Sequence, residues 1–87
     1  MFVILVYDVK ESRVSKALKI CRQYLHWVQN SVFEGELTGA QLAKLQFALR
    51  HVLNLEEDSV VLYKFRTKHY FKRETMGIEK GGEEGFI

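Results

Sequence analysis

The first feature of this 87-residue chain that could do chemistry is an acid at the end of an apolar run. Residues 2–7 read Phe-Val-Ile-Leu-Val-Tyr, and Asp8 follows them directly. An ionised carboxylate is rarely buried without a partner, so we expect Asp8 to lie where a buried strand meets water, a metal ion or a cation. Two interpretations stay open on these residues alone. Asp8 either begins an ordinary loop or contributes a hard oxygen ligand to an ion such as Mg²⁺.

Basic residues are distributed unevenly, although the formal net charge is only +2. One group follows Asp8 and contains a single acid, Glu11; its basic members are Lys10, Arg13, Lys16, Lys19 and Arg22. A second group contains no acid; its members are Lys64, Arg66, Lys68, Lys72 and Arg73. Such stripes attract a polyanion, and the alternative is that they are solvated surfaces without a partner. The pattern therefore favours nucleic acid as one of two interpretations.

The sequence lacks the residue patterns that several other kinds of catalytic and binding site require. The histidines at 26, 51 and 69 have no metal-ligand or nucleophile spacing, and no glycine-rich loop follows the first apolar run. Cys21 is alone, which excludes a disulfide framework and a CxxC site, and we expect it to be an ordinary buried thiol. No segment is long enough to span a membrane and the amino terminus does not resemble a secretory signal, so we predict a cytoplasmic protein.

The elements that position these residues follow from periodicity. Residues 2–7 predict a strand buried on both faces, and Ser12 is expected to cap a helix that carries its apolar residues at helical spacing up to Leu25. Residues 26–37 predict a tight hairpin with Asn30-Ser31 at its turn. Thr38 and Gln41 fit a capping box for a second helix that fades near residue 54.

A further apolar strand is predicted over residues 59–65, which completes the order βαββαβ. We therefore expect an α+β fold of the ferredoxin-like type, with both helices on one face of a four-stranded antiparallel sheet. Residues 69–75 could add one more strand, and residues 1–78 would form a single domain. Residues 79–87 have the acidic and glycine-rich composition of a flexible tail.

Two helices cover only one face of such a sheet, yet the first strand is apolar on both faces. A large exposed apolar patch is unusual for a soluble monomer, so we expect a homodimer that packs sheet against sheet. The strand at residues 69–75 would then pair with the open sheet edge of the partner. A two-fold axis near Asp8 would let two carboxylates share one Mg²⁺ ion.

The motifs together resemble a known family. Four motifs occur in the order and spacing of the CRISPR-associated protein two family. They are the strand ending in Tyr7-Asp8-Val9, the helix-opening Arg13, the segment 29–37 (Gln-Asn-Ser-Val-Phe-Glu-Gly-Glu-Leu) and the sequence 57–60 (Glu-Asp-Ser-Val). The resemblance extends from residue 2 to about residue 65. It implies a ferredoxin-like homodimer whose C-terminal strand crosses to the partner.

The resemblance also implies a role in spacer acquisition, as a dimer that binds duplex DNA between integrase subunits. Some members are Mg²⁺-dependent nucleases on single-stranded RNA or duplex DNA, with the strand-end acid as metal ligand and catalytic residue, which corresponds to Asp8. The family's nucleic-acid residues correspond to Tyr7, Arg13, Ser31 and Phe33, and Lys10 would steady phosphate charge beside them. Two arginines that some relatives carry are replaced by Glu11 and Trp27.

Two main functions follow, and a third is disfavoured. A scaffold would track the duplex backbone with Lys10, Arg13, Lys16, Lys19 and Arg22, without reading bases. The alternative is a protein that works primarily as a metal-dependent endoribonuclease, and the lost arginines argue against strong ribonuclease activity. A small-molecule-binding ferredoxin-like regulatory domain is the third possibility, and nothing in the sequence indicates a ligand pocket for it.

Overall fold

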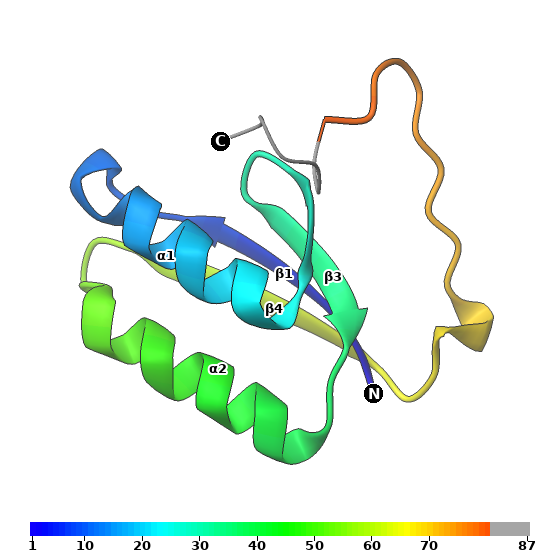
Figure 1. Ribbon diagram of the computed structural model, residues 1–87, viewed down its shortest axis with the longest axis horizontal. Helices are drawn as coiled ribbons and strands as arrows, with labels where there is room; N and C mark the ends of the chain where they lie inside the picture. The colour runs from blue at the N-terminus through cyan, green and yellow to red at the C-terminus, as the bar shows by residue number, and fades with distance from the viewer. Residues whose placement is uncertain (81–87) are drawn as a thin grey trace.

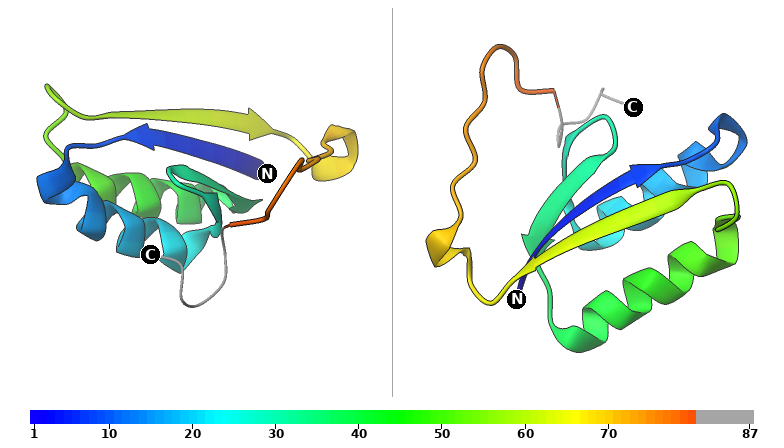
Figure 2. Two further views of the ribbon diagram at one scale, coloured as in Figure 1. Left: turned by 90° about the horizontal axis from the view of Figure 1, so that it is seen from above. Right: turned by 180° about the vertical axis from the view of Figure 1, so that it is seen from behind.

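The computed structural model describes residues 1–80 and has the expected α+β architecture. Four strands form one antiparallel sheet in the order β2-β3-β1-β4: β1 (Phe2–Asp8), β2 (His26–Gln29), β3 (Val32–Glu36) and β4 (Ser59–Phe65). Two helices, α1 (Glu11–Tyr24) and α2 (Gly39–Val52), lie side by side on one face of it (Figures 1 and 2). The ferredoxin-like prediction is confirmed.

The core lies between the sheet and the two helices. Alternate residues of β1 point toward the helices, so Val3, Leu5 and Tyr7 are buried, the first two completely. Their neighbours from the helices are Ala17, Cys21, Leu42, Leu45 and Leu49. Burying a large aliphatic or aromatic side chain stabilises the fold by roughly 1.5–3 kcal/mol. This packing holds β1 in the middle of the sheet and fixes where its last residue, Asp8, emerges.

The two helices begin in different ways. At α2 the predicted capping box is confirmed, since the Gln41 amide donates to the Thr38 hydroxyl and the Gln41 side chain accepts from the Thr38 amide. At α1 the prediction that Ser12 is the N-cap is wrong. The N-cap is Lys10, without a side-chain cap of its own. The Lys10 amide donates to the side chain of Asp58, the residue before β4. A contact with a distant part of the chain therefore sets the start of α1.

The predicted hairpin is confirmed, with β2 and β3 joined at Asn30 and Ser31. Asn30 takes a φ of 38°, a left-handed conformation that asparagine tolerates in turns. The Trp27 indole N–H donates to the Asn30 carbonyl at 2.8 Å, and the Tyr7 amide donates to the Ser31 carbonyl at 3.1 Å. The turn is therefore bound to the end of β1, beside Asp8.

The segment after β4 differs from the prediction. We expected a strand at residues 69–75, but within residues 66–80 the backbone forms only a 3₁₀ turn, Lys68–Tyr70, and an extended stretch that leaves the sheet (Figure 1). Phe71 packs its ring 4.6 Å from that of Phe2 and 5.9 Å from that of Phe65. A strand needs a hydrogen-bonding neighbour, and the edge expected to supply it belongs to a second copy of the chain. The extra strand is therefore not a property of the single chain.

The predicted tail over residues 79–87 is described only at its start. Glu79 pairs with Arg73 at 3.2 Å, and residues 81–87 lie outside the described part of the chain. The single-domain boundary at residue 78 stays a prediction.

The sheet face opposite the helices, here called the open face, carries Ile4, Val6, Val61 and Tyr63 in register across β1 and β4. Val61 is 46% exposed and Tyr63 is 54% exposed. Figure 2 shows the two strands from behind with no helix over them.

Within residues 1–80, no helix has the length and hydropathy needed to cross a bilayer.

Candidate functional site

Asp8 is the last residue of β1 and pairs with Ser59, the first residue of β4. Strand alternation puts its side chain on the open face, in line with Ile4 and Val6. The carboxylate is exposed, and within residues 1–80 it takes part in no hydrogen bond or ion pair. It borders a shallow depression at the strand end; the lining residues are Tyr7, Asp8, Val9, Val14, Asn30 and Ser31. The structure thus brings together three of the predicted site residues, Tyr7, Asp8 and Ser31.

Phe33 was also predicted to bind nucleic acid, and the structure contradicts that role. Its side chain is completely buried on the helix side of β3, paired across the ladders with Leu5 and Trp27. The ring centroid lies 5.4 Å from that of Tyr7, in a tilted arrangement. A side chain without exposed surface cannot touch nucleic acid, so Phe33 is a core residue. The sequence carried a signal for this, because Glu34 and Glu36 share the opposite face of β3 and strand alternation leaves Phe33 on the other one.

Tyr7 is also largely enclosed, at 5% exposure, although it lines the depression beside Asp8. Burial, and to a smaller extent the neighbouring Cys21 thiol, raise the pKa of the Tyr7 phenol to about 12. The phenol is therefore protonated at neutral pH. Its visible role is to support the end of β1 through its ring and its amide.

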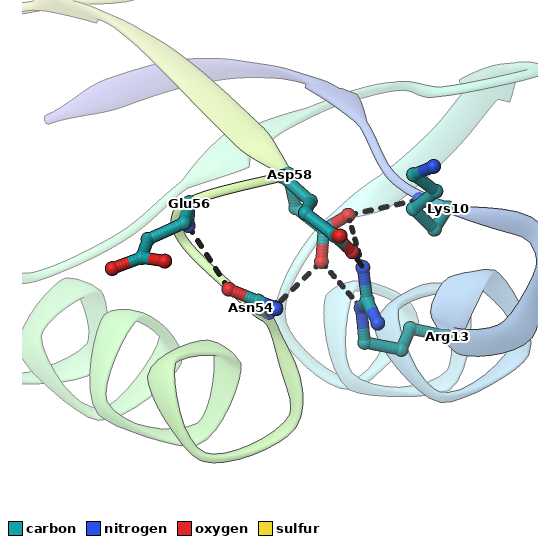
Figure 3. A network of polar contacts seen from close by, with 6 residues as sticks. Lys10, Arg13, Asn54, Glu56 and Asp58 are labelled. Atoms are coloured by element: carbon teal, nitrogen blue, oxygen red, sulfur yellow. Dashed lines mark hydrogen bonds and ion pairs between the residues drawn. The ribbon is translucent and has the colours of Figure 1, made fainter.

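Arg13 occupies a place that the sequence did not predict (Figure 3). Its Nε donates to the Asp58 carboxylate at 2.6 Å, and one terminal nitrogen donates to Asp58 at 3.0 Å and to Glu57 at 2.9 Å. Asp58 also accepts from the amides of Lys10 and Asn54, each at 2.9 Å. Arg13 therefore ties α1 to the loop before β4, and its predicted contact with nucleic acid stays a prediction.

The Asp58 carboxylate is fully buried but ionised. The Arg13 guanidinium, with help from the Lys10 and Asn54 amides, holds the pKa of Asp58 well below its usual range despite burial. The same contacts raise the pKa of Arg13. Sequence reasoning assigned no role to Asp58, although the Glu57-Asp58 pair had been noticed as part of the family pattern. An acid immediately before an apolar strand was the available signal.

The remaining basic residues of the first group lie on the surface of α1. We call Lys16, Lys19 and Arg22 the basic surface of α1; all three are exposed. The Arg22 guanidinium also lies 5.4 Å from the centroid of the Trp27 ring, a cation–π distance. The helix α1 that carries this surface lies on the side of the sheet opposite the open face (Figure 2). Lys10 is exposed at the start of α1, close in the chain to Asp8.

A metal ion would find an incomplete site in one chain. Within residues 1–80 no group of three acidic, histidine or cysteine side chains could hold an ion. Asp8 is the single carboxylate that lines the depression. Mg²⁺ is often bound through one or two carboxylates while it keeps several waters. The donor set therefore fits Mg²⁺ as one half of a site shared by two copies of the chain.

Comparisons with known proteins find one family model and several similar chains. Residues 1–73 match the family model described as CRISPR associated protein Cas2. The chain is 54% identical over 86 residues to the protein named CRISPR-associated endoribonuclease Cas2 2 of Archaeoglobus fulgidus, covering 97% of this chain and 94% of that one. It is 52% identical over 87 residues to the protein named CRISPR-associated endoribonuclease Cas2 of Thermotoga maritima, covering 100% and 99%. A crystal structure of a Cas2 protein superposes with a TM-score of 0.84 at 45% identity, covering 100% and 98%.

Proposed function

The chain belongs to the Cas2 family of CRISPR-associated proteins, and on this premise we propose that it is the dimeric scaffold of spacer acquisition, which binds duplex DNA and bridges integrase subunits. The observation that carries the proposal is the separation of two surfaces. The apolar open face lies on one side of the sheet, and the basic surface of α1 lies on the other (Figure 2).

The open face supplies the dimer contact. Ile4 and Val6 of β1 lie next to Tyr63 and Val61 of β4, and contiguous apolar side chains of this kind are usually covered in a soluble protein. A second copy of the chain covers them with an identical surface, as a two-fold symmetric dimer requires. The segment after β4, which packs Phe71 against the start of β1, gains a strand partner on the second copy.

The basic surface of α1 supplies the DNA contact. Successive members three residues apart rise by about 4.5 Å along the helix, so they can follow one strand of a duplex backbone. Each Lys or Arg that neutralises a phosphate releases condensed counterions, which gives affinity without base recognition. In a dimer joined through the open face, both copies of this surface remain outside, available to one long duplex.

A second candidate, a Mg²⁺-dependent endonuclease on single-stranded RNA or duplex DNA, is favoured by the exposed Asp8. Two Asp8 carboxylates from the two protomers would hold the ion. When bound, Mg²⁺ polarises a phosphoryl oxygen and lowers the pKa of a bound water. Lys10 would steady the phosphate charge beside it. Tyr7 stays protonated and the lining of the depression holds no second carboxylate to act as a base, so turnover is slow.

The two candidates separate in a reconstituted integration reaction with the integrase partner. The variant Lys16→Glu/Lys19→Glu should weaken duplex binding. The slope of log Kd against the logarithm of the salt concentration should fall by about one for each lost phosphate contact. Integration should fall with it. The matched control is Lys44→Glu, an exposed lysine of α2, which should keep parent affinity. Parent-like binding by the double variant would contradict the DNA-binding surface.

The variant Asp8→Ala should abolish Mg²⁺-dependent cleavage and leave integration unchanged. If integration is lost in a folded, dimeric Asp8→Ala protein, the scaffold assignment is wrong and the metal site does the main work. If the variant cleaves as well as the parent, the nuclease site lies elsewhere.

A further inference from the structure

The Asp58 carboxylate is the most highly coordinated side chain near the end of β1. It accepts four hydrogen bonds: one from the Lys10 amide, one from the Asn54 amide and two from Arg13. The side chain has no exposed surface, and an ionised carboxylate is stable there only because both oxygens have donors. Figure 3 shows the group between the loop before β4 and the start of α1.

This carboxylate lies one residue before the partner of Asp8. Ser59 pairs with Asp8 across the β1–β4 ladder, and Asp58 precedes Ser59 in the chain. Lys10, whose amide Asp58 binds at 2.9 Å, comes two residues after Asp8. Asp58 therefore spans the point at which the β1 ladder ends and the chain turns into α1.

On the other side, the hairpin holds the residue before Asp8. The Tyr7 amide donates to the Ser31 carbonyl at 3.1 Å, which fixes β1 one residue before the acid. Asp8 thus sits between two anchored amides, those of Tyr7 and Lys10. The Tyr7 anchor is a backbone-to-backbone bond, whereas the Lys10 anchor depends on the side chain of Asp58 and can be removed by mutation.

We propose that Asp58 is a positioning residue for the Asp8 site, which holds the Asp8 carboxylate in place by binding the Lys10 amide and is itself held by Arg13. The inference rests on the proposed role of Asp8 as metal ligand. It also gives Arg13 a role that differs from a phosphate contact: its guanidinium neutralises and orients Asp58. Two carboxylates from separate protomers can share an ion only if each protomer presents its acid in a fixed position, which is what this contact supplies.

Removing the Asp58 carboxylate tests the proposal. In Asp58→Ala no side-chain oxygen is left to accept from the Lys10 amide, so this amide should lose protection from hydrogen exchange. Outer partners of metal ligands typically change affinity by about 10–100-fold, so Mn²⁺ binding measured by calorimetry should weaken at least about tenfold. The nuclease kcat should fall while KM for nucleic acid stays within about twofold, because no substrate-contacting group is altered.

Glu57→Gln is the matched control. Glu57 contacts the same Arg13 nitrogen at 2.9 Å but touches neither Lys10 nor Asn54, so this variant should keep parent Lys10 protection and Mn²⁺ affinity. If Glu57→Gln reproduces the defects, Arg13 acts independently of Asp58 and the proposal is overturned. If Asp58→Ala is folded and dimeric with parent exchange at Lys10, the proposal is overturned as well.

A measurement on the parent protein keeps the inference testable even if Asp58→Ala does not fold. The Lys10 amide should exchange as slowly as the paired amides of β1, and exchange at the rate of an open loop contradicts the proposal. The proposed metal site fails separately. A parent dimer that binds no Mn²⁺ refutes the metal role of Asp8, while the Lys10 exchange rates still decide whether Asp58 anchors the strand end.

Discussion

Asp8 and Asp58 lie at the same end of the β1–β4 ladder but in opposite environments. Asp8 is exposed on the open face, whereas Asp58 is enclosed by donors from three residues, Lys10, Arg13 and Asn54. The first is available to an ion or a ligand. The Asp58 carboxylate is fully occupied by hydrogen bonds within the fold. Its negative charge also stabilises the start of α1, since a negative group at a helix amino terminus interacts favourably with the helix dipole.

Because the pKa of Asp58 is lowered in the folded protein, the stability of the fold should depend on pH in the acid range. Because the folded-state pKa lies below the unfolded value of about 3.9, the Asp58 contribution is complete above that value and is lost as pH falls toward the folded pKa. Parent protein should therefore be more thermostable than Asp58→Asn at pH 7, and the difference in Tm should shrink below about pH 4. Circular-dichroism melts from pH 7 to pH 2 measure this. A constant difference in Tm across the range would show that Asp58 ionisation does not stabilise the fold.

Cys21 behaves as the buried thiol that the sequence predicted. It is a free cysteine with no exposed surface, and burial raises its pKa to about 12. We expect a thiol-specific reagent to modify native protein at pH 8 at least about a hundredfold more slowly than protein unfolded in guanidinium, because the reactive thiolate is scarce and enclosed. The time course of colour development with a disulfide reagent measures both rates. Equal rates would mean that α1 does not stay packed on the sheet.

At the scale of elements, the two helices differ in what determines their first residue: contacts between neighbouring residues at α2 and a contact with a distant residue at α1. The start of α2 is determined by Thr38 and Gln41, three residues apart, so the sequence pattern was sufficient. The start of α1 is determined by Asp58, which is 48 residues from Lys10. A local pattern contains no information about such a partner, and Ser12, the better cap by type, lies inside the first turn.

Substitutions at the start of α2 test the capping box. Thr38→Ala should lower the free energy of unfolding by about 1 kcal/mol, because the Gln41 amide loses its acceptor. The control is Gly39→Ala, at the first helical residue, where an added Cβ meets nothing within 4 Å; it should raise stability by about 0.4–1 kcal/mol. Urea unfolding at one fixed protein concentration measures both. A destabilising Gly39→Ala would mean that α2 begins elsewhere in solution.

At the scale of the whole molecule, the two-layer architecture leaves one sheet face without a cover. The helices protect the side of β1 that carries Val3 and Leu5, while Val61 and Tyr63 of β4 stay half exposed on the other side. The open face also carries Asp8 at its edge, so covering it with a second chain would enclose the apolar surface and bring two Asp8 carboxylates together, as the proposed metal site requires.

A charge on the open face should therefore break the dimer. We expect Val61→Glu to weaken dimerisation at least about tenfold, because burying an unpaired carboxylate in an apolar interface is costly. Phe47→Glu is the matched control, since Phe47 is a more exposed apolar residue, at 63%, but lies on α2. Sedimentation equilibrium measures both variants. Dissociation caused by Phe47→Glu instead would place the interface on the helix layer.

Features that depend on neighbouring residues could be predicted from the sequence. Periodicity predicted both helices and the four strands of the sheet, Asn30 and Ser31 predicted the hairpin, and the apolar run before Asp8 predicted an exposed acid at a strand end. These succeed because turn chemistry, capping and alternation act over a few residues.

Only the tertiary structure decided which partner each side chain meets. Arg13 binds Asp58 because folding brings together segments 45 residues apart. Residues 69–75 form no strand in one chain, since a strand depends on an edge that the chain does not offer them. Long-range contacts are chosen by packing and charge pairing in three dimensions, which a linear pattern does not encode.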